Sequence, residues 1–180
     1  MPGLRSLRLG HNRLSTLPAS LSLLTRLSLL HVSNNVLAAL PEALSALHAL
    51  VDLDLSNNRL TILPAGLGCA TGLTRLVAAR NPLLAPPPEV LRQGAAAAVR
   101  YLAGVKAGRR EEPMDWRELG LMTLDTLSVM LPDGLGVSVR ELYLDDNFLV
   151  ILHPELFQCL PNLEVGCPML ERTPPPRLFN

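Results

Sequence analysis

Asp52 and Asp54 are the two side chains in this sequence that most readily suggest chemistry. They lie two positions apart in the segment LVDLDLSNN, and alternate residues of a strand point to the same face. Two carboxylates on one face suit general acid–base catalysis or the binding of a cation. The surrounding sequence indicates neither a cleft nor a third ligand, so a solvated acidic patch is the favoured interpretation. Asp145 and Asp146 are interpreted in the same way.

The histidines and cysteines are too dispersed to predict a metal centre or a reactive thiol. Histidine occurs at four scattered positions: His11, His31, His48 and His153. The three cysteines, which form no CxxC pair, are Cys69, Cys159 and Cys167. The sequence also lacks a phosphate-binding glycine loop, an HExxH motif and a nucleophile elbow. We therefore predict a non-catalytic protein with no catalytic residue, metal ligand or cofactor.

A template of 23 residues recurs along residues 4–91 and predicts the elements that would position these side chains. Its first leucine recurs as Leu4, Leu27, Leu50 and Leu73. Its asparagine recurs as Asn12, Asn35, Asn58 and Asn81. A Leu-Pro pair follows in the first three turns, at Leu17-Pro18, Leu40-Pro41 and Leu63-Pro64. A repeat of this length predicts a solenoid in which each turn supplies one short strand.

This pattern resembles the leucine-rich repeat family, in the 23-residue Leu-Pro form found in many intracellular proteins. The segment NPL..PP.EV..QG....YL resembles the terminal turn and capping helix of Ras-suppressor-like members. The resemblance implies an α/β solenoid, with a parallel β-sheet on the concave face and short helices or turns on the convex face. It also implies structural roles for the four asparagines and for Asn147. An amide side chain can satisfy peptide groups where the chain bends after each strand.

The expected organisation is four repeats followed by less regular segments. Residues 1–107 are predicted to hold the four repeats and a capping helix over residues 89–107, and the glycine-rich third convex segment is expected to be the loosest. Residues 108–138 read as a linker and a poorly defined segment, where Trp116, Leu119, Met122 and Leu127 could line a helix. Residues 139–164 form a further repeat that must dock on something, because one repeat buries too little core to fold alone. Residues 165–180 are predicted to be disordered.

Composition limits the class of protein. The 16 Lys and Arg balance the 16 Asp and Glu, which argues against non-specific nucleic-acid binding. No window reaches the ~20 apolar residues of a membrane span, and the N-terminus, already in the repeat register, is not a signal peptide. The cysteines suggest reduced thiols in the cytosol or nucleus, although a Cys159–Cys167 disulfide in a secreted solenoid stays open. Both ends look unfinished, so we expect a fragment, splice form or partial gene model of a longer protein as one interpretation.

The concave face is the expected binding surface for a protein partner. Its candidate residues are Arg8, His31, Asp52, Asp54, Arg75, Val77 and Arg80, joined by Tyr143 if the last repeat continues the first sheet. Mixed charge with isolated apolar side chains suits a protein partner. We expect a cytosolic scaffold or adaptor, and the resemblance implies small-GTPase signalling as one setting. Two alternatives stay open: the substrate-recognition part of a larger enzyme such as a ubiquitin ligase or kinase, and a truncated isoform without independent function.

Overall fold

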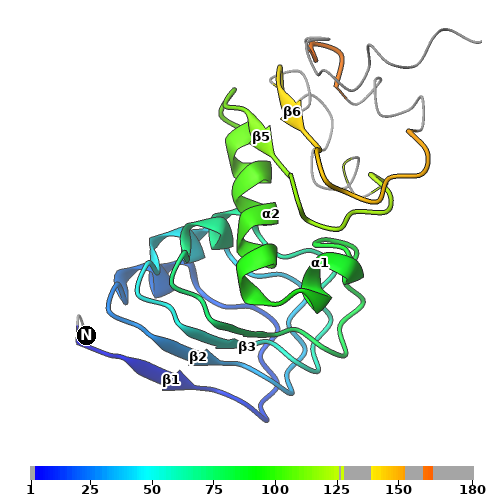
Figure 1. The fold of residues 1–180 in the computed structure, drawn as a ribbon. Helices are drawn as coiled ribbons and strands as arrows, with labels where there is room; N and C mark the ends of the chain where they lie inside the picture. The colour runs from blue at the N-terminus through cyan, green and yellow to red at the C-terminus, as the bar shows by residue number, and fades with distance from the viewer. Residues whose placement is uncertain (1–2, 126, 128–138, 153–159, 164–180) are drawn as a thin grey trace, which may run out of the picture.

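The computed structural model describes residues 3–125, 127, 139–152 and 160–163. Four short parallel strands form the first sheet, in the order β1 (Ser6–Arg8), β2 (Leu29–His31), β3 (Asp52–Asp54) and β4 (Arg75–Val77). They lie side by side at one edge of the molecule (Figure 1). Each strand is displaced by one repeat from its neighbour, so that Leu30 lies opposite Leu53 and Leu53 opposite Leu76. We call residues 4–91 the first array.

The core lies between this sheet and a row of 3-10 turns. The central leucine of β2 and of β3 points inward and is fully buried. Three 3-10 turns, η1 (Ala19–Leu23), η2 (Glu42–Ala46) and η3 (Ala65–Cys69), form the convex side. Each follows a proline of the Leu-Pro pair with φ near −70°, because the pyrrolidine ring fixes that angle where the chain turns back. The parallel sheet and convex turns confirm the predicted fold.

The asparagines tie each bend to the preceding turn. Asn58 is buried; its Oδ1 accepts from the N–H of Leu37 at 3.0 Å, and its Nδ2 donates to the carbonyls of Leu55 and Val32 at 2.9 and 3.0 Å. Asn35 and Asn81 make equivalent bonds. A buried peptide group without a partner costs free energy, so these amides fix the register between turns.

Two helices follow β4 where one was expected. They are α1 (Pro88–Arg92) and α2 (Ala95–Gly108), separated at Gly94, whose φ of 101° is readily adopted only by glycine. The helix α2 covers η3 so closely that a Cβ on Gly68 would lie 2.4 Å from the backbone nitrogen of Ala103. This reverses the expectation of a loose third convex segment. Its glycines permit close packing, and four of the five η3 residues are buried.

Residues 114–124, part of the segment that the sequence left poorly defined, form another repeat-like turn. The strand β5 (Met114–Asp115) pairs in parallel with β6 (Leu142–Tyr143), and together they form a separate two-stranded sheet. Asn147 accepts from the N–H of Leu121 at 2.9 Å and donates to the carbonyl of Trp116 at 2.7 Å, as the asparagines of the first array do. We call residues 114–124 and 139–152 the second array. The segment 139–152 therefore docks on β5 and does not extend the first sheet.

The helix α2 lies between the two arrays (Figure 1). One side packs on η3, and the other meets β5 at Gly104, where an added Cβ would lie 2.4 Å from Nε1 of Trp116. None of the described helices is both long and apolar enough to span a bilayer. The predicted disordered segment, residues 165–180, together with His153, Cys159 and Cys167, lies outside the described residues.

Candidate functional site on the concave face

Seven of the eight predicted binding residues lie on the first sheet or directly after it. Two rows of outward-facing positions cross the strands. The first row is Ser6, Leu29, Asp52 and Arg75, and the second is Arg8, His31, Asp54 and Val77. Arg80 lies at the bend after β4. We call these two rows together with Arg80 the concave face.

Tyr143 is not part of the concave face. It lies on β6 and pairs with Asp115 of β5 in the second sheet. Its assignment depended on the last repeat joining the first sheet, and α2 separates the two sheets instead. The prediction that included Tyr143 in the same surface as Val77 is therefore wrong.

Asp52 is the centre of a charged cluster that crosses three strands. Its Oδ1 accepts a hydrogen bond from Nη1 of Arg75 at 2.8 Å and lies 3.1 Å from Nε2 of His31. The His31 contact is within ion-pair distance, but Nε2 has no well-aligned hydrogen-bond partner among the described residues. Partial burial raises the pKa of Asp52, but the hydrogen bond from Arg75 and the nearby imidazole of His31 outweigh this and hold the pKa below its usual value.

Asp54 has different partners from Asp52. Its Oδ1 accepts from the N–H of Ser56 at 3.0 Å and from the Ser56 hydroxyl at 2.7 Å. The two carboxylates thus share a face but do not converge on one point. Within the ranges the structure describes, no group of three or more His, Cys, Asp or Glu side chains is placed to hold a metal ion.

The bends after the four strands present a third row of polar side chains. His11, Asn34, Asn57 and Arg80 hold the same position in successive turns, and all have a positive φ between 53° and 58°. Side-chain contacts cross from turn to turn, with Asn34 Nδ2 3.3 Å from His11 Nε2 and Arg80 Nη1 donating to Asn57 Oδ1 at 3.4 Å. These contacts continue the ordered surface along one rim of the sheet.

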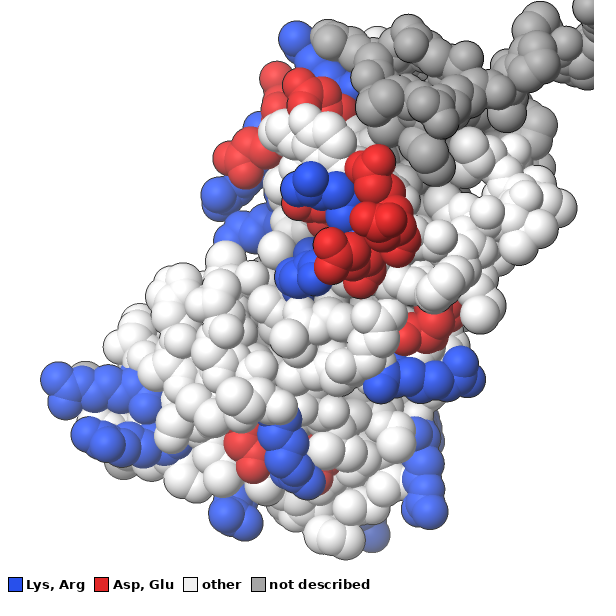
Figure 2. Space-filling model, viewed as in Figure 1, with Lys and Arg blue, Asp and Glu red and all other residues white. Residues whose placement is uncertain are grey.

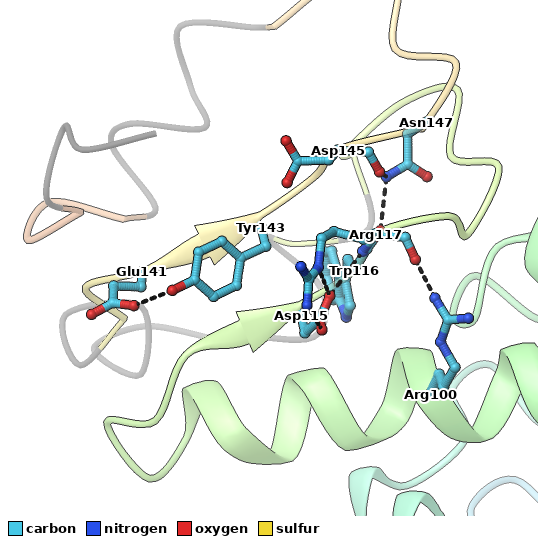
Figure 3. Close-up of polar contacts among 8 residues, drawn as sticks. All are labelled: Arg100, Asp115, Trp116, Arg117, Glu141, Tyr143, Asp145 and Asn147. Atoms are coloured by element: carbon cyan, nitrogen blue, oxygen red, sulfur yellow. Dashed lines mark hydrogen bonds and ion pairs between the residues drawn. The ribbon is translucent and has the colours of Figure 1, made fainter. Parts of the chain in front are cut away.

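A second polar cluster lies on the second array (Figure 3). The guanidinium of Arg117 donates to both carboxylate oxygens of Asp115, at 2.9 and 2.6 Å, and lies 5.4 Å from the centre of the Tyr143 ring. These hydrogen bonds lower the pKa of Asp115 to about 2. The Tyr143 hydroxyl donates to Glu141 at 2.5 Å, which raises the pKa of the phenol. Sequence reasoning missed Asp115 and Arg117, because no repeat register was assigned to their segment.

The formal net charge of zero conceals a separation of charge along the chain. Residues 1–110 carry 12 of the 16 Lys and Arg but only four of the 16 Asp and Glu, and residues 111–180 carry the converse. Figure 2 shows carboxylates gathered over the region of β5 and β6, while basic side chains predominate around the first array. Counting charges by segment would have revealed this from the sequence. The two arrays therefore present opposite electrostatic potentials to a partner.

Comparison with known proteins decides what these turns are. A family model described as Leucine Rich Repeat matches residues 3–24 and 49–70, which are the first and third turns of the first array. The chain thus contains leucine-rich repeats. Leucine-rich repeat domains are generally protein-binding modules, which agrees with the expected class of partner. No curated protein matches the chain.

Several solved leucine-rich repeat structures are similar in part. A protein of this kind from Leptospira interrogans is 37% identical over 51% of this chain and 24% of its own, with a TM-score of 0.48. The ectodomain of the Arabidopsis thaliana receptor kinase GASSHO1/SCHENGEN3, solved with CASPARIAN STRIP INTEGRITY FACTOR 2, is 22% identical. The match covers 89% of this chain and 18% of the ectodomain, with a TM-score of 0.46. An internalin, InlF, from Listeria monocytogenes is 16% identical over 91% of this chain and 47% of its own, with a TM-score of 0.44. The leucine-rich repeat chain described here thus spans less than half the length of each.

Proposed function

We propose that this chain is a non-catalytic interaction module, a cytosolic scaffold or adaptor, that binds a protein partner through the concave face. The observation that carries the proposal is the cluster in which Asp52 joins His31 and Arg75 across three strands. It forms a charged centre held by the sheet itself, and Val77 and Leu29 lie beside it as half-buried apolar positions.

The sheet limits the entropy that binding would cost. Each side chain of the cluster is attached to a strand whose register is fixed by backbone hydrogen bonds and by the buried asparagines. Side chains that are already ordered lose little conformational freedom when a partner binds. Alternating acidic and basic groups favour a partner with the complementary arrangement, which provides specificity and steers association.

The signalling setting is a finer part of the proposal. The 23-residue Leu-Pro pattern and the segment after Asn81 resemble intracellular relatives of the Ras-suppressor type. That resemblance supports a small GTPase, or a protein of its pathway, as the partner class. A purified panel of small GTPases in their GDP-bound and GTP-bound forms tests this part separately from the binding surface.

Affinity capture from cell lysate tests the concave face. The intact chain is compared with the double variant Asp52→Lys, Asp54→Lys and with the matched control Glu111→Lys, Glu112→Lys. The control makes the same charge change at two exposed residues beyond α2. Circular dichroism and melting first establish that all three chains are folded.

The proposal predicts that specific partners bind the intact chain and the control, and that the concave variant loses them by at least about tenfold, equivalent to about 1.4 kcal/mol. If the folded concave variant recovers the same partners as the intact chain, the binding surface lies elsewhere and the proposal is wrong.

A further inference from the structure

The outer edge of β4 presents backbone N–H donors whose equivalents in the preceding turns are hydrogen-bonded to the next turn. The N–H groups of Leu55 and Asn57 donate to carbonyls of the β4 turn at 2.7 and 3.0 Å, and the earlier turns repeat this pattern. The corresponding N–H groups after β4 belong to Ala78 and Arg80. Neither has a backbone acceptor among the described residues, because β5 belongs to the other sheet. An unpaired strand edge is a template for another strand.

A groove of about 400 Å³ lies beside this edge, between the β4 turn and α1. Its walls include the half-buried side chains of Leu76, Leu83 and Leu91. The exposed side chains of Arg80 and Arg92 also line it. No acidic side chain lines the groove among the described residues.

Ala78 explains why the groove is hollow. In the second and third turns the corresponding positions are Val32 and Leu55, which are fully buried under the next turn. Alanine at this position leaves the volume of a larger apolar side chain unfilled, and no further strand of the first sheet stacks beyond β4. An apolar side chain supplied by another segment would fit this space.

The charges at the groove define the other requirement. Arg75, on β4 itself, already binds the carboxylate of Asp52 from the neighbouring strand at 2.8 Å. Arg80 and Arg92 add two further cations at the groove, which favours carboxylates on whatever binds there. Free N–H donors, an apolar hollow and uncompensated arginines together match an extended segment in which acidic and apolar residues alternate.

We propose that an extended, alternately acidic and apolar segment of a protein partner adds to the outer edge of β4, parallel to that strand. Its carbonyls accept from Ala78 and Arg80, its apolar side chains enter the groove, and its carboxylates face Arg80 and Arg92. This rests on the proposed function, since it names a binding mode and a partner chemistry for an interaction module, but it uses a different part of the surface from Asp52 and Asp54.

The chain itself provides a probe of the required chemistry. Residues 50–58, LVDLDLSNN, alternate leucine with aspartate. In the sheet, the carbonyls of Asp54 and Ser56 in this segment accept from Val32 and Asn34 at 2.8 and 2.9 Å. These two donors hold the positions that correspond to Ala78 and Arg80. A labelled peptide with this sequence can therefore form the same bonds at β4, and the peptide LVKLKLSNN provides the charge-reversed control.

Fluorescence anisotropy and amide hydrogen exchange test the inference on the full chain. We expect saturable binding of LVDLDLSNN and slower exchange of the Ala78 and Arg80 amides when the peptide is bound.

The variant Arg80→Glu, Arg92→Glu should weaken peptide binding at least tenfold, and Ala78→Trp should weaken it by filling the groove. Arg5→Glu, Arg26→Glu, the same charge change at the opposite end of the array, should leave the affinity within about twofold. The positive φ at residue 80 does not preclude glutamate, because Glu118 holds the corresponding position at φ 55°.

The inference is overturned by any of three results: no saturable binding up to about 1 mM, which corresponds to only about −4 kcal/mol; equal binding of LVKLKLSNN; or binding without protection of Ala78 and Arg80. The variant Asp52→Lys, Asp54→Lys separates this inference from the proposed function, because it should lose the concave-face partner yet keep the peptide. If the intact chain does not bind the peptide but its partner capture depends on Asp52 and Asp54, only the groove is refuted. If the intact chain binds the peptide but its partner capture does not depend on Asp52 and Asp54, only the concave face is refuted.

Discussion

The indole ring of Trp116 stacks on the phenol ring of Tyr101, with ring centres 4.5 Å apart and planes inclined by 11°. The Nε1–H of the same indole donates to the Tyr101 carbonyl at 2.9 Å. Both side chains are fully buried. Because Tyr101 belongs to α2 and Trp116 directly follows β5, this contact joins the second array to the helix that also covers η3. The stability of the two arrays is therefore coupled through α2.

Trp116→Ala should remove this coupling. Losing the stacked ring should lower the free energy of unfolding by about 3–5 kcal/mol, measured by urea unfolding. Trp116→Phe keeps a ring but loses the Nε1–H donor and part of the stacked surface, so we expect a smaller cost of about 1–3 kcal/mol. An unchanged stability in Trp116→Ala would show that the arrays are not coupled here.

Asn58→Ala should destabilise the first array through its unsatisfied peptide groups. The substitution leaves the buried N–H of Leu37 without its acceptor, and the carbonyls of Val32 and Leu55 without their donor. We expect a loss of about 1–3 kcal/mol for each group that water cannot reach, measured by thermal unfolding. Asn12→Ala is the control, because Asn12 is exposed and, within the described part of the chain, its side chain bonds only to carbonyls of its own turn. Equal effects at the two positions would contradict this account of the buried amides.

Gly68→Ala should disturb the contact between η3 and α2. Its Cβ would lie 2.4 Å from the backbone nitrogen of Ala103, and a helix backbone cannot move aside as a flexible side chain can. Overpacking of this kind typically costs about 1–3 kcal/mol. Gly72→Ala is the matched control, since the nearest atom to its Cβ would be 3.8 Å away. Chemical denaturation should show a lower free energy of unfolding for Gly68→Ala than for Gly72→Ala. Equal free energies would mean that α2 does not pack against η3 as closely as described.

The carboxyl of Asp115 should titrate well below an ordinary aspartate. Hydrogen bonds from Arg117 lower its pKa from 3.8 to about 2. A depressed pKa in the folded state means that the stabilising contribution is present above about pH 4 and is lost as the pH falls through about 2. Both side chains are half exposed, so solvent screening keeps this contribution to stability small. NMR titration of the carboxyl carbon checks the midpoint, and a midpoint near 3.8 would show that the pair does not form.

The first array could be predicted because its signals are local and repeated. The step from Leu27 to Leu50 and the Leu-Pro pairs fix strand, bend and return path, so the rows of the sheet follow directly. The second array could not be predicted, because its first turn departs from the template in two ways. Leu119 occupies the position that asparagine holds in the other turns, and Met114 lies 28 residues before its strand partner Leu142, whereas the repeat step is 23. The misplacement of Tyr143 followed from that missed turn.

The glycine-rich third convex segment was misjudged for a different reason. Few large apolar side chains between Gly66 and Gly72 suggested poor packing when that turn was considered alone. The structure shows that the small residues admit the backbone of α2, a contact between segments far apart in the chain. Charge was misjudged in a similar way, since a net value of zero for the whole chain hid the opposite charges of its two halves.

Site-specific photo-crosslinking tests most directly whether the concave face binds the partner. A photoreactive phenylalanine derivative replaces Val77, half-buried on the second row of the concave face, or Leu23, which is 72% exposed on the convex side. Each folded protein is irradiated in lysate with the captured partner present. The account predicts a specific crosslinked protein from position 77 and none from position 23. A partner that crosslinks from position 23 but not from position 77 would contradict it.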